Sequence, residues 1–125
     1  MDVQKQIDYW RSGSVEDMEV AGILLDKDRV RHALFFAELA VEKVLKAHVA
    51  KVTCGIPPRT HDLLRLADLA KLSLSPQRRD SFAGFQQYCL AGRYPDHQPP
   101  AISHEAAELE IAKAREIQKW LMSLL

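Results

Sequence analysis

The chain has 125 residues and a mass of 14.2 kDa, so we expect one domain over residues 1–125 that folds without a metal or a disulfide. Lys and Arg together number 17, as do Asp and Glu, and this zero net charge disfavours a strongly basic nucleic-acid binder but leaves room for a local patch. The longest apolar run covers residues 33–37, far short of the about 20 that span a bilayer. We therefore expect a cytoplasmic protein with no membrane association.

The two cysteines, Cys54 and Cys89, follow no CxxC or Cys/His spacing. We expect reduced, structural thiols, and we expect no metal site and no cofactor.

Charge is unevenly distributed along the chain. Residues 1–26 hold six acidic and two basic residues, a net charge of −4, whereas residues 27–65 hold four acidic and eight basic residues, a net charge of +4. We interpret this as complementarity between two neighbouring helices, in preference to a surface dedicated to polyanions.

A helix is predicted over about residues 3–26, because apolar or small residues recur every three or four positions. Gly13 weakens its middle by about 1 kcal/mol. Ser14 with Asp17 resembles a capping box, so a helix that restarts at Val15 stays an alternative. The predicted buried stripe is Ile7, Trp10, Ser14, Met18, Ala21 and Leu25.

A second helix is predicted from a cap at Asp28 to about Val52. The Gly- and Pro-rich residues 53–59 end it, so the first two helices should form an antiparallel hairpin. Small alanines on the buried face allow close approach. The predicted buried stripe is Ala33, Ala37, Ala40, Val41, Val44, His48 and Val49.

The rest of the chain also reads as helix. Thr60 is the expected cap of a short helix, and Ser75 with Pro76 begins a fourth, which buries Phe82, Phe85 and Cys89. Residues 92–102 should be irregular, and Ser103 should cap a last helix that reaches the end of the chain. The apolar residues of the short and the last helix are Leu63, Leu66, Ala67, Ala70, Ala107, Ile111, Ala114, Ile117, Leu121 and Leu124.

The predicted fold is all-α: an antiparallel up-and-down bundle of four main helices plus one short helix. Trp120, Met122 and Leu125 lie off the main stripe of the last helix. They predict a second apolar face and hence a homodimer, in which two-fold symmetry brings two copies of the Arg93 loop together.

The first polar group that could carry chemistry is Glu38, Glu42 and Lys46, spaced by four residues, with Lys43 beside them. Glu42 and Lys46 suit an ion pair within the helix. Glu38 and Glu42 repel unless a cation lies between them, which predicts an Arg or Lys from another segment. The alternative is a solvent-exposed ion-pair face.

The second group is residues 60–63, where His61 is expected in the first turn of the short helix. There the helix dipole favours a neutral imidazole that donates or accepts a hydrogen bond. The alternative is a structural histidine near the cap.

The third group is residues 92–97. Arg93 can bind phosphate, Tyr94 can stack on a base, and His97 can move a proton, which together are what metal-free RNA cleavage needs. In the alternative, Arg93 pairs with Glu38 or Glu42, Tyr94 packs at the rim and His97 is an exposed loop residue.

The combination resembles a known family. The segments that carry the resemblance are residues 31–47 (RHALFFAELAVEKVLKA), 60–63 (THDL) and 93–96 (RYPD). Together with Asp17 and the amphipathic last helix, they are similar to the HEPN domain family over nearly the whole chain.

The resemblance implies a compact helical bundle that dimerises and that often accompanies a small nucleotidyltransferase in prokaryotic two-gene modules of toxin–antitoxin type. Several HEPN branches are metal-independent endoribonucleases with an Arg and a His further apart than Arg93 and His97, which have three residues between them, including Pro95. This shorter spacing favours a branch with an Arg-Tyr-Pro-Asp segment, for which nucleotide or partner binding is suggested. Glu38 also stands where relatives often carry Gln, and its carboxylate would repel phosphate unless Arg93 or Lys46 neutralises it.

Three hypotheses follow. The leading one is a nucleotide- or RNA-binding module, or a partner of a nucleotidyltransferase. The second is a ribonuclease in which His97 is the general base and Arg93 stabilises the transition state. The third is a purely structural helical dimer. The expected binding residues are Glu38, Glu42, Lys43, Lys46, His61, Arg93 and Tyr94.

Overall fold

The computed structural model describes residues 2–94 and 101–125, without the side chains of residues 90–93. This part of the chain holds helices and no strand, which confirms the all-α prediction. None of these helices is long and apolar enough to cross a membrane. The helices are α1 (Val3–Asp26), α2 (Val30–Thr53), α3 (Leu63–Leu69), α4 (Pro76–Arg93) and α5 (His104–Ser123).

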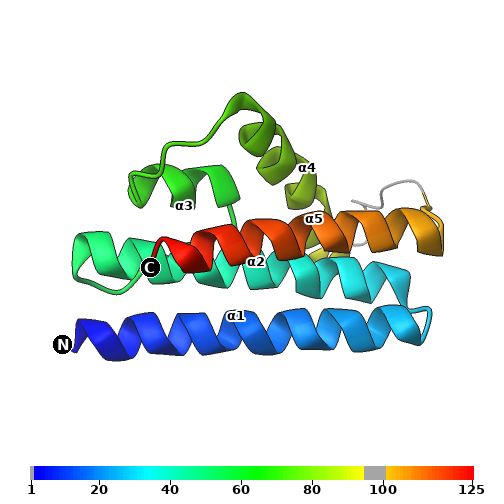
Figure 1. Cartoon of the computed structure of the whole chain (residues 1–125), viewed down its shortest axis with the longest axis horizontal. Helices are drawn as coiled ribbons and strands as arrows, with labels where there is room; N and C mark the ends of the chain where they lie inside the picture. The colour runs from blue at the N-terminus through cyan, green and yellow to red at the C-terminus, as the bar shows by residue number, and fades with distance from the viewer. Residues whose placement is uncertain (1, 95–100) are drawn as a thin grey trace.

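The helices are arranged around α2 (Figure 1). Helices α1 and α2 form the predicted antiparallel hairpin, α5 runs beside α2, and α3 and α4 lie on the side of α2 that faces away from α1. Helix α2 contacts all four other helices, whereas α1 contacts α2 and α5. The four long helices alternate in direction along the chain, with α4 inclined to the other three (Figure 1), so the predicted up-and-down bundle is confirmed.

The central position of α2 follows from its small residues, which let neighbouring helices approach closely. Every member of its predicted stripe is buried, and further positions around the helix are buried too. The stripes predicted for α1, α4 and α5 also face the core. Within them, Trp10 is only partly buried and Leu124 is exposed.

Helix α1 is continuous, so the alternative of a restart at Val15 is wrong. Ser14 is fully buried and serves as a link between helices: its hydroxyl donates to the Ala40 carbonyl at 2.6 Å and accepts from Gln118 Nε2 at 2.9 Å. Gly13 has a packing role, because a Cβ there would lie 3.1 Å from Lys43 Cδ.

Two predicted caps hold and two are wrong. Ser103 accepts from Ala106 N at 3.0 Å, and Ser75 accepts from Arg78 N at 3.1 Å. Asp28 does not cap α2. It has a φ of 57° and belongs to the end of α1, which closes in a Schellman motif in which the next N–H, of residue 29, bonds to the carbonyl of residue 24 at 2.8 Å.

The cap of α3 is Asp62, not Thr60. The Asp62 carboxylate accepts from Arg65 N at 3.2 Å, and the Thr60 hydroxyl accepts from Asp62 N at 3.2 Å. Thr60 therefore shapes the turn before the helix. The expectation that His61 lies in the first turn is wrong as well, since His61 precedes the cap.

His48 is a buried histidine that ties α2 to the C-terminal end of α5. Its Nε2 lies 2.7 Å from the Leu121 carbonyl oxygen, and since a carbonyl can only accept, Nε2 donates. Burial lowers the pKa of His48 below its ordinary value of 6.5, while the hydrogen bond to Leu121 opposes that shift.

This arrangement predicts a loss of stability in acid. Below about pH 6.5 the unfolded chain binds a proton at His48 before the folded chain does, so the free energy of unfolding falls as the pH falls through the lowered pKa. Urea unfolding between about pH 7.5 and 5 should show this, and His48→Gln, which keeps a donor, should weaken the dependence. Equal slopes for the two proteins would contradict the prediction.

The pKa of His104 is shifted in the opposite direction, so its effect on the pH dependence of stability must be distinguished from that of His48. Its hydrogen bond to Asp28 raises the pKa of His104, so its stabilising effect is present below the ordinary pKa and is lost as the pH rises through the raised one. Repeating the comparison in a His104→Gln background removes this contribution.

Candidate functional site

Three charged residues of α2 lie inside the bundle. Glu38, Glu42 and Lys46 are 1%, 2% and 6% exposed, so the alternative of a solvent-exposed ion-pair face is wrong. The reason is that the four other helices pack against α2 and cover most of it, a fact that spacing along one helix does not reveal. We refer to these three residues with His61 as the α2 cluster.

Glu42 is the centre of the described contacts in the α2 cluster. Its Oε2 lies 3.1 Å from Lys46 Nζ, which confirms the predicted pair, and its Oε1 lies 3.0 Å from His61 Nδ1. An ionised carboxylate only accepts, so Nδ1 carries the hydrogen in this contact. The ammonium of Lys46 also lies over the ring of Trp10, 5.1 Å from its centroid, a cation–π contact with α1.

Lys43 belongs to a different contact. Its Nζ binds Asp17 Oδ2 at 2.8 Å, which joins α1 to α2. This pair is an instance of the predicted charge complementarity between the acidic first helix and the basic second one. It also means that Lys43 faces α1 and is engaged there.

The predicted residues after α4 are only partly within the described structure. Tyr94 is 52% exposed, while the side chain of Arg93 and the whole of His97 lie outside the described residues. The expected pairing of Arg93 with the α2 cluster and the composite cleft of a dimer therefore stay predictions.

His61 lies in the turn before α3, and contacts at the start of α3 and with the middle of α4 hold this turn in place. Asp62 caps α3 directly after it, and the first N–H of α3, of Leu63, donates to Gln86 Oε1 of α4 at 3.0 Å. The side chain of His61 is 45% exposed, so the α2 cluster opens to solvent on this side.

The sequence interpretation missed several residues that contact the α2 cluster or lie beside it. Trp10 was assigned to the core stripe, Gln86 was not singled out, and Cys89 was treated as a structural thiol. Cys89 is buried and unbridged, and it lies within 4.8 Å of donor atoms of Glu42 and His61. Contacts between three separate elements create this group, so no local spacing announces it.

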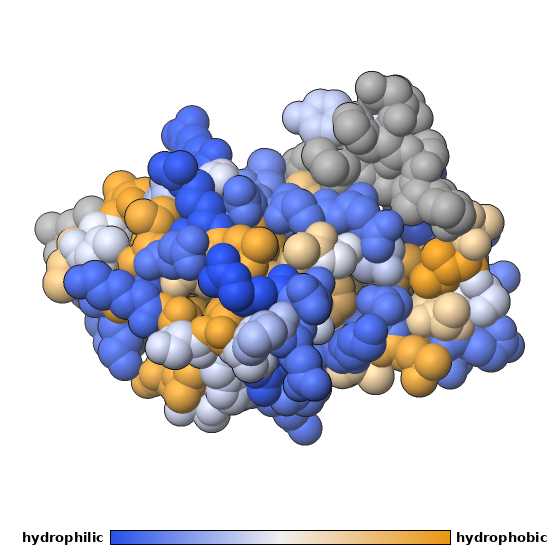
Figure 2. Space-filling model, turned by 90° about the horizontal axis from the view of Figure 1, so that it is seen from above, coloured by the Kyte–Doolittle hydropathy of each residue, from blue (hydrophilic) through white to orange (hydrophobic). Residues whose placement is uncertain are grey.

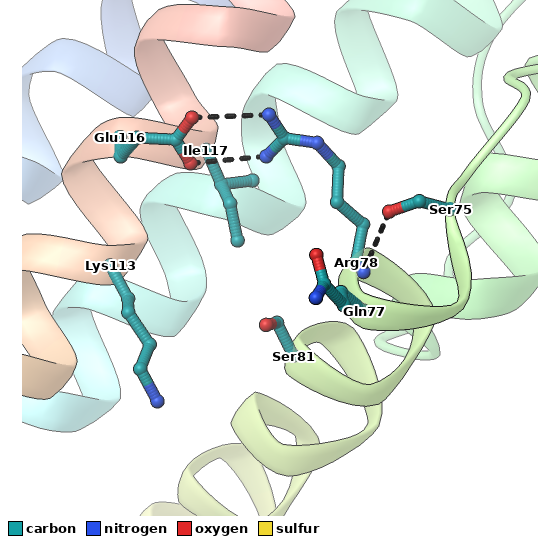
Figure 3. A pocket seen from close by; sticks show the side chains of 7 residues that line it. All are labelled: Ser75, Gln77, Arg78, Ser81, Lys113, Glu116 and Ile117. Atoms are coloured by element: carbon teal, nitrogen blue, oxygen red, sulfur yellow. Dashed lines mark hydrogen bonds and ion pairs between the residues drawn. The ribbon is translucent and has the colours of Figure 1, made fainter.

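A groove of about 410 Å³ lies between α4 and α5 (Figure 3). Arg78 occupies one end, where its guanidinium binds Glu116 through two hydrogen bonds of 3.0 and 3.1 Å. Lys113, on the other side, binds Glu110 at 3.2 Å. Both cations that line the groove bind carboxylates, as Lys46 does, but no charged residue that lines the groove is buried. The groove is therefore an ordinary surface ion-pair region and a weaker candidate than the buried α2 cluster.

The apolar face expected on the last helix is not present as a bare surface. Trp120, Met122 and Leu125 pack against the core, and Arg78 lies over the Trp120 ring at 3.9 Å. Figure 2, which views the molecule from above, shows hydrophobic residues in separate patches between hydrophilic ones. These three residues therefore do not support the predicted dimer.

Comparison with known proteins agrees with the fold. Residues 7–124 match the family model "HEPN domain". The crystal structure of TT1696 from Thermus thermophilus is similar with a TM-score of 0.79, at 22% sequence identity, over 96% of this chain and 98% of that chain. At this identity the likeness shows the fold alone. No curated protein matches the chain.

Proposed function

This chain belongs to the HEPN domain family, and from that premise we propose that it is a nucleotide- or RNA-binding module whose site is built around the α2 cluster. Membership suggests a function related to nucleotides or RNA. HEPN domains often form dimers, and a homodimer is part of the proposal. So are a nucleotidyltransferase partner, a two-gene toxin–antitoxin setting and a cytoplasmic location.

The observation that carries the proposal is the burial of charge on α2. Taking Glu38, Glu42 and Lys46 out of water costs several kcal/mol per ion, and apolar side chains of the same size would stabilise the bundle as well or better. Such a group beside a half-exposed histidine is typical of a functional site.

The chemistry of the described residues suits a phosphate ligand. Lys46 provides an ammonium held by Glu42 and Trp10. An ammonium has three N–H donors, so it can bind a phosphate oxygen while it keeps its contact with Glu42. His61 offers a second donor on the open side. Tyr94, half exposed just after α4, offers a ring face for a base.

Binding measurements with Lys46→Met test the proposal. Met keeps the apolar stem over Trp10 but removes the charge, so binding of ATP or a short single-stranded RNA at low salt should weaken roughly tenfold or more. Lys51→Met is the matched control, because Lys51 is exposed on the same helix. Fluorescence anisotropy in EDTA gives the affinities, and circular dichroism checks that both variants fold.

Two outcomes would overturn the proposal. One is that neither ATP nor RNA binds the unsubstituted protein. The other is that Lys51→Met weakens binding as much as Lys46→Met, since the attraction would then be a general surface effect. If the RNA is cut in the presence of EDTA, the ribonuclease hypothesis with Arg93 and His97 replaces simple binding.

A further inference from the structure

Three metal-ligating side chains from three segments meet beside α3. Glu42 comes from α2, His61 from the turn before α3 and Cys89 from α4, and one donor atom of each lies within 4.8 Å of the other two. The Glu42 Oε1 and His61 Nδ1 atoms are 3.0 Å apart. No other group of this kind occurs in the described part of the chain.

The spacing is close to that of a metal site. A tetrahedral zinc ion has bonds of about 2.0–2.3 Å to oxygen, nitrogen and sulfur, which puts its ligand atoms about 3.3–3.8 Å from one another. The Glu42 and His61 donors need to separate only slightly to admit an ion. The thiol lies within 4.8 Å of the other two donors, so it has to approach by at most about 1 Å.

The surroundings also suit a metal. Glu42 and Cys89 are each 2% exposed, so two of the ligands lie on packed helices and are shielded from water. Lys46 holds the second oxygen of Glu42 at 3.1 Å and so leaves Oε1 for the ion, as partners of metal-binding carboxylates do. The His61 side chain is 45% exposed, so this side of the group is open to solvent and provides an entry path.

We infer that Glu42, His61 and Cys89 bind a divalent transition-metal ion of the zinc type, with water as the fourth ligand. A mixed set of thiolate, imidazole and carboxylate favours Zn²⁺ or Co²⁺ over Mg²⁺ or Ca²⁺. On binding, the Cys89 thiol releases its proton to solvent, and the His61 hydrogen moves from Nδ1 to Nε2. Glu42 binds as the carboxylate, so one proton leaves per ion.

This inference goes beyond the proposed function, because it needs no nucleotide. Metal binding would fasten the turn that holds His61 to α2 and α4. It would therefore raise the melting temperature of the protein, as any ligand of the folded state does.

Cobalt titration of the metal-free full-length protein tests the inference. We expect visible bands of tetrahedral Co²⁺ together with a near-ultraviolet thiolate-to-cobalt band, and Zn²⁺ should displace both. Cys89→Ser should abolish the thiolate band and weaken binding by roughly tenfold or more. Cys54→Ser is the matched control, because Cys54 is the exposed cysteine, and it should leave the spectrum unchanged.

His61→Gln provides a second variant in case Cys89→Ser does not fold. The half-exposed His61 side chain lies before the cap of α3, so its replacement should keep the fold and still weaken Co²⁺ binding. The inference is wrong if the unsubstituted protein shows no thiolate band at millimolar Co²⁺, or if Cys54→Ser removes the band. Because nucleotide binding is measured in EDTA, the two proposals fail independently.

Discussion

Glu42→Ala is expected to lower the free energy of unfolding by about 3–5 kcal/mol, because it leaves a buried charge without its partner. The variant leaves the ammonium of Lys46, 6% exposed, without its carboxylate. It also removes the acceptor of the His61 Nδ1 hydrogen. Urea denaturation followed by circular dichroism measures the loss.

The double variant Glu42→Leu, Lys46→Met distinguishes two quantities: the free energy lost when one partner of the pair is removed, and the net contribution of the intact pair to stability. Replacing both charges by apolar groups of similar size removes the unpaired buried ion, so stability should recover to near that of the parent. A single variant as stable as the parent would mean that water reaches Lys46. That result would remove the argument from buried charge on which the proposed function rests.

Phe82→Ala should cost about 3–5 kcal/mol as well, because it empties a fully buried aromatic site. Phe82 is 0% exposed and belongs to the main core cluster together with residues of α2, α3 and α5. It anchors the first half of α4, the helix that carries Gln86 and Cys89. The variant should therefore also weaken cobalt binding, although Phe82 is not one of the three ligands.

Gly84→Ala is the matched control on the same helix. A Cβ at Gly84 would meet no atom within 4 Å, so the substitution brings only the helix propensity of alanine and should stabilise the protein by up to about 1 kcal/mol. Thermal and urea unfolding measure both variants. A destabilised Gly84→Ala, or a Phe82→Ala variant that unfolds like the parent, would contradict this description of α4.

Periodicity alone correctly predicted the buried faces of the long helices. Examples are the buried alanines and valines of α2 and the apolar stripes of α1, α4 and α5. A helix with a continuous apolar stripe must bury it, and the short connections then leave few arrangements open. The helix ends were less predictable. Asp28 and Thr60 have side chains suited to capping. In the structure, however, Asp28 adopts the left-handed conformation that ends α1, and the Thr60 hydroxyl stabilises the turn before α3.

Periodicity and composition by themselves determined the all-α bundle, the approximate position of each helix and the pairing of Glu42 with Lys46, because these depend on neighbours within one helix. The exact ends did not follow: α4, for example, reaches Arg93, beyond the predicted start of the irregular segment at residue 92. Only the tertiary structure decided that this pair is buried, that Lys43 binds Asp17, and that His61 and Cys89 meet at Glu42. Those facts depend on which helices cover α2 and at what angle α4 crosses it. Such contacts join residues distant along the chain, and no local spacing records them.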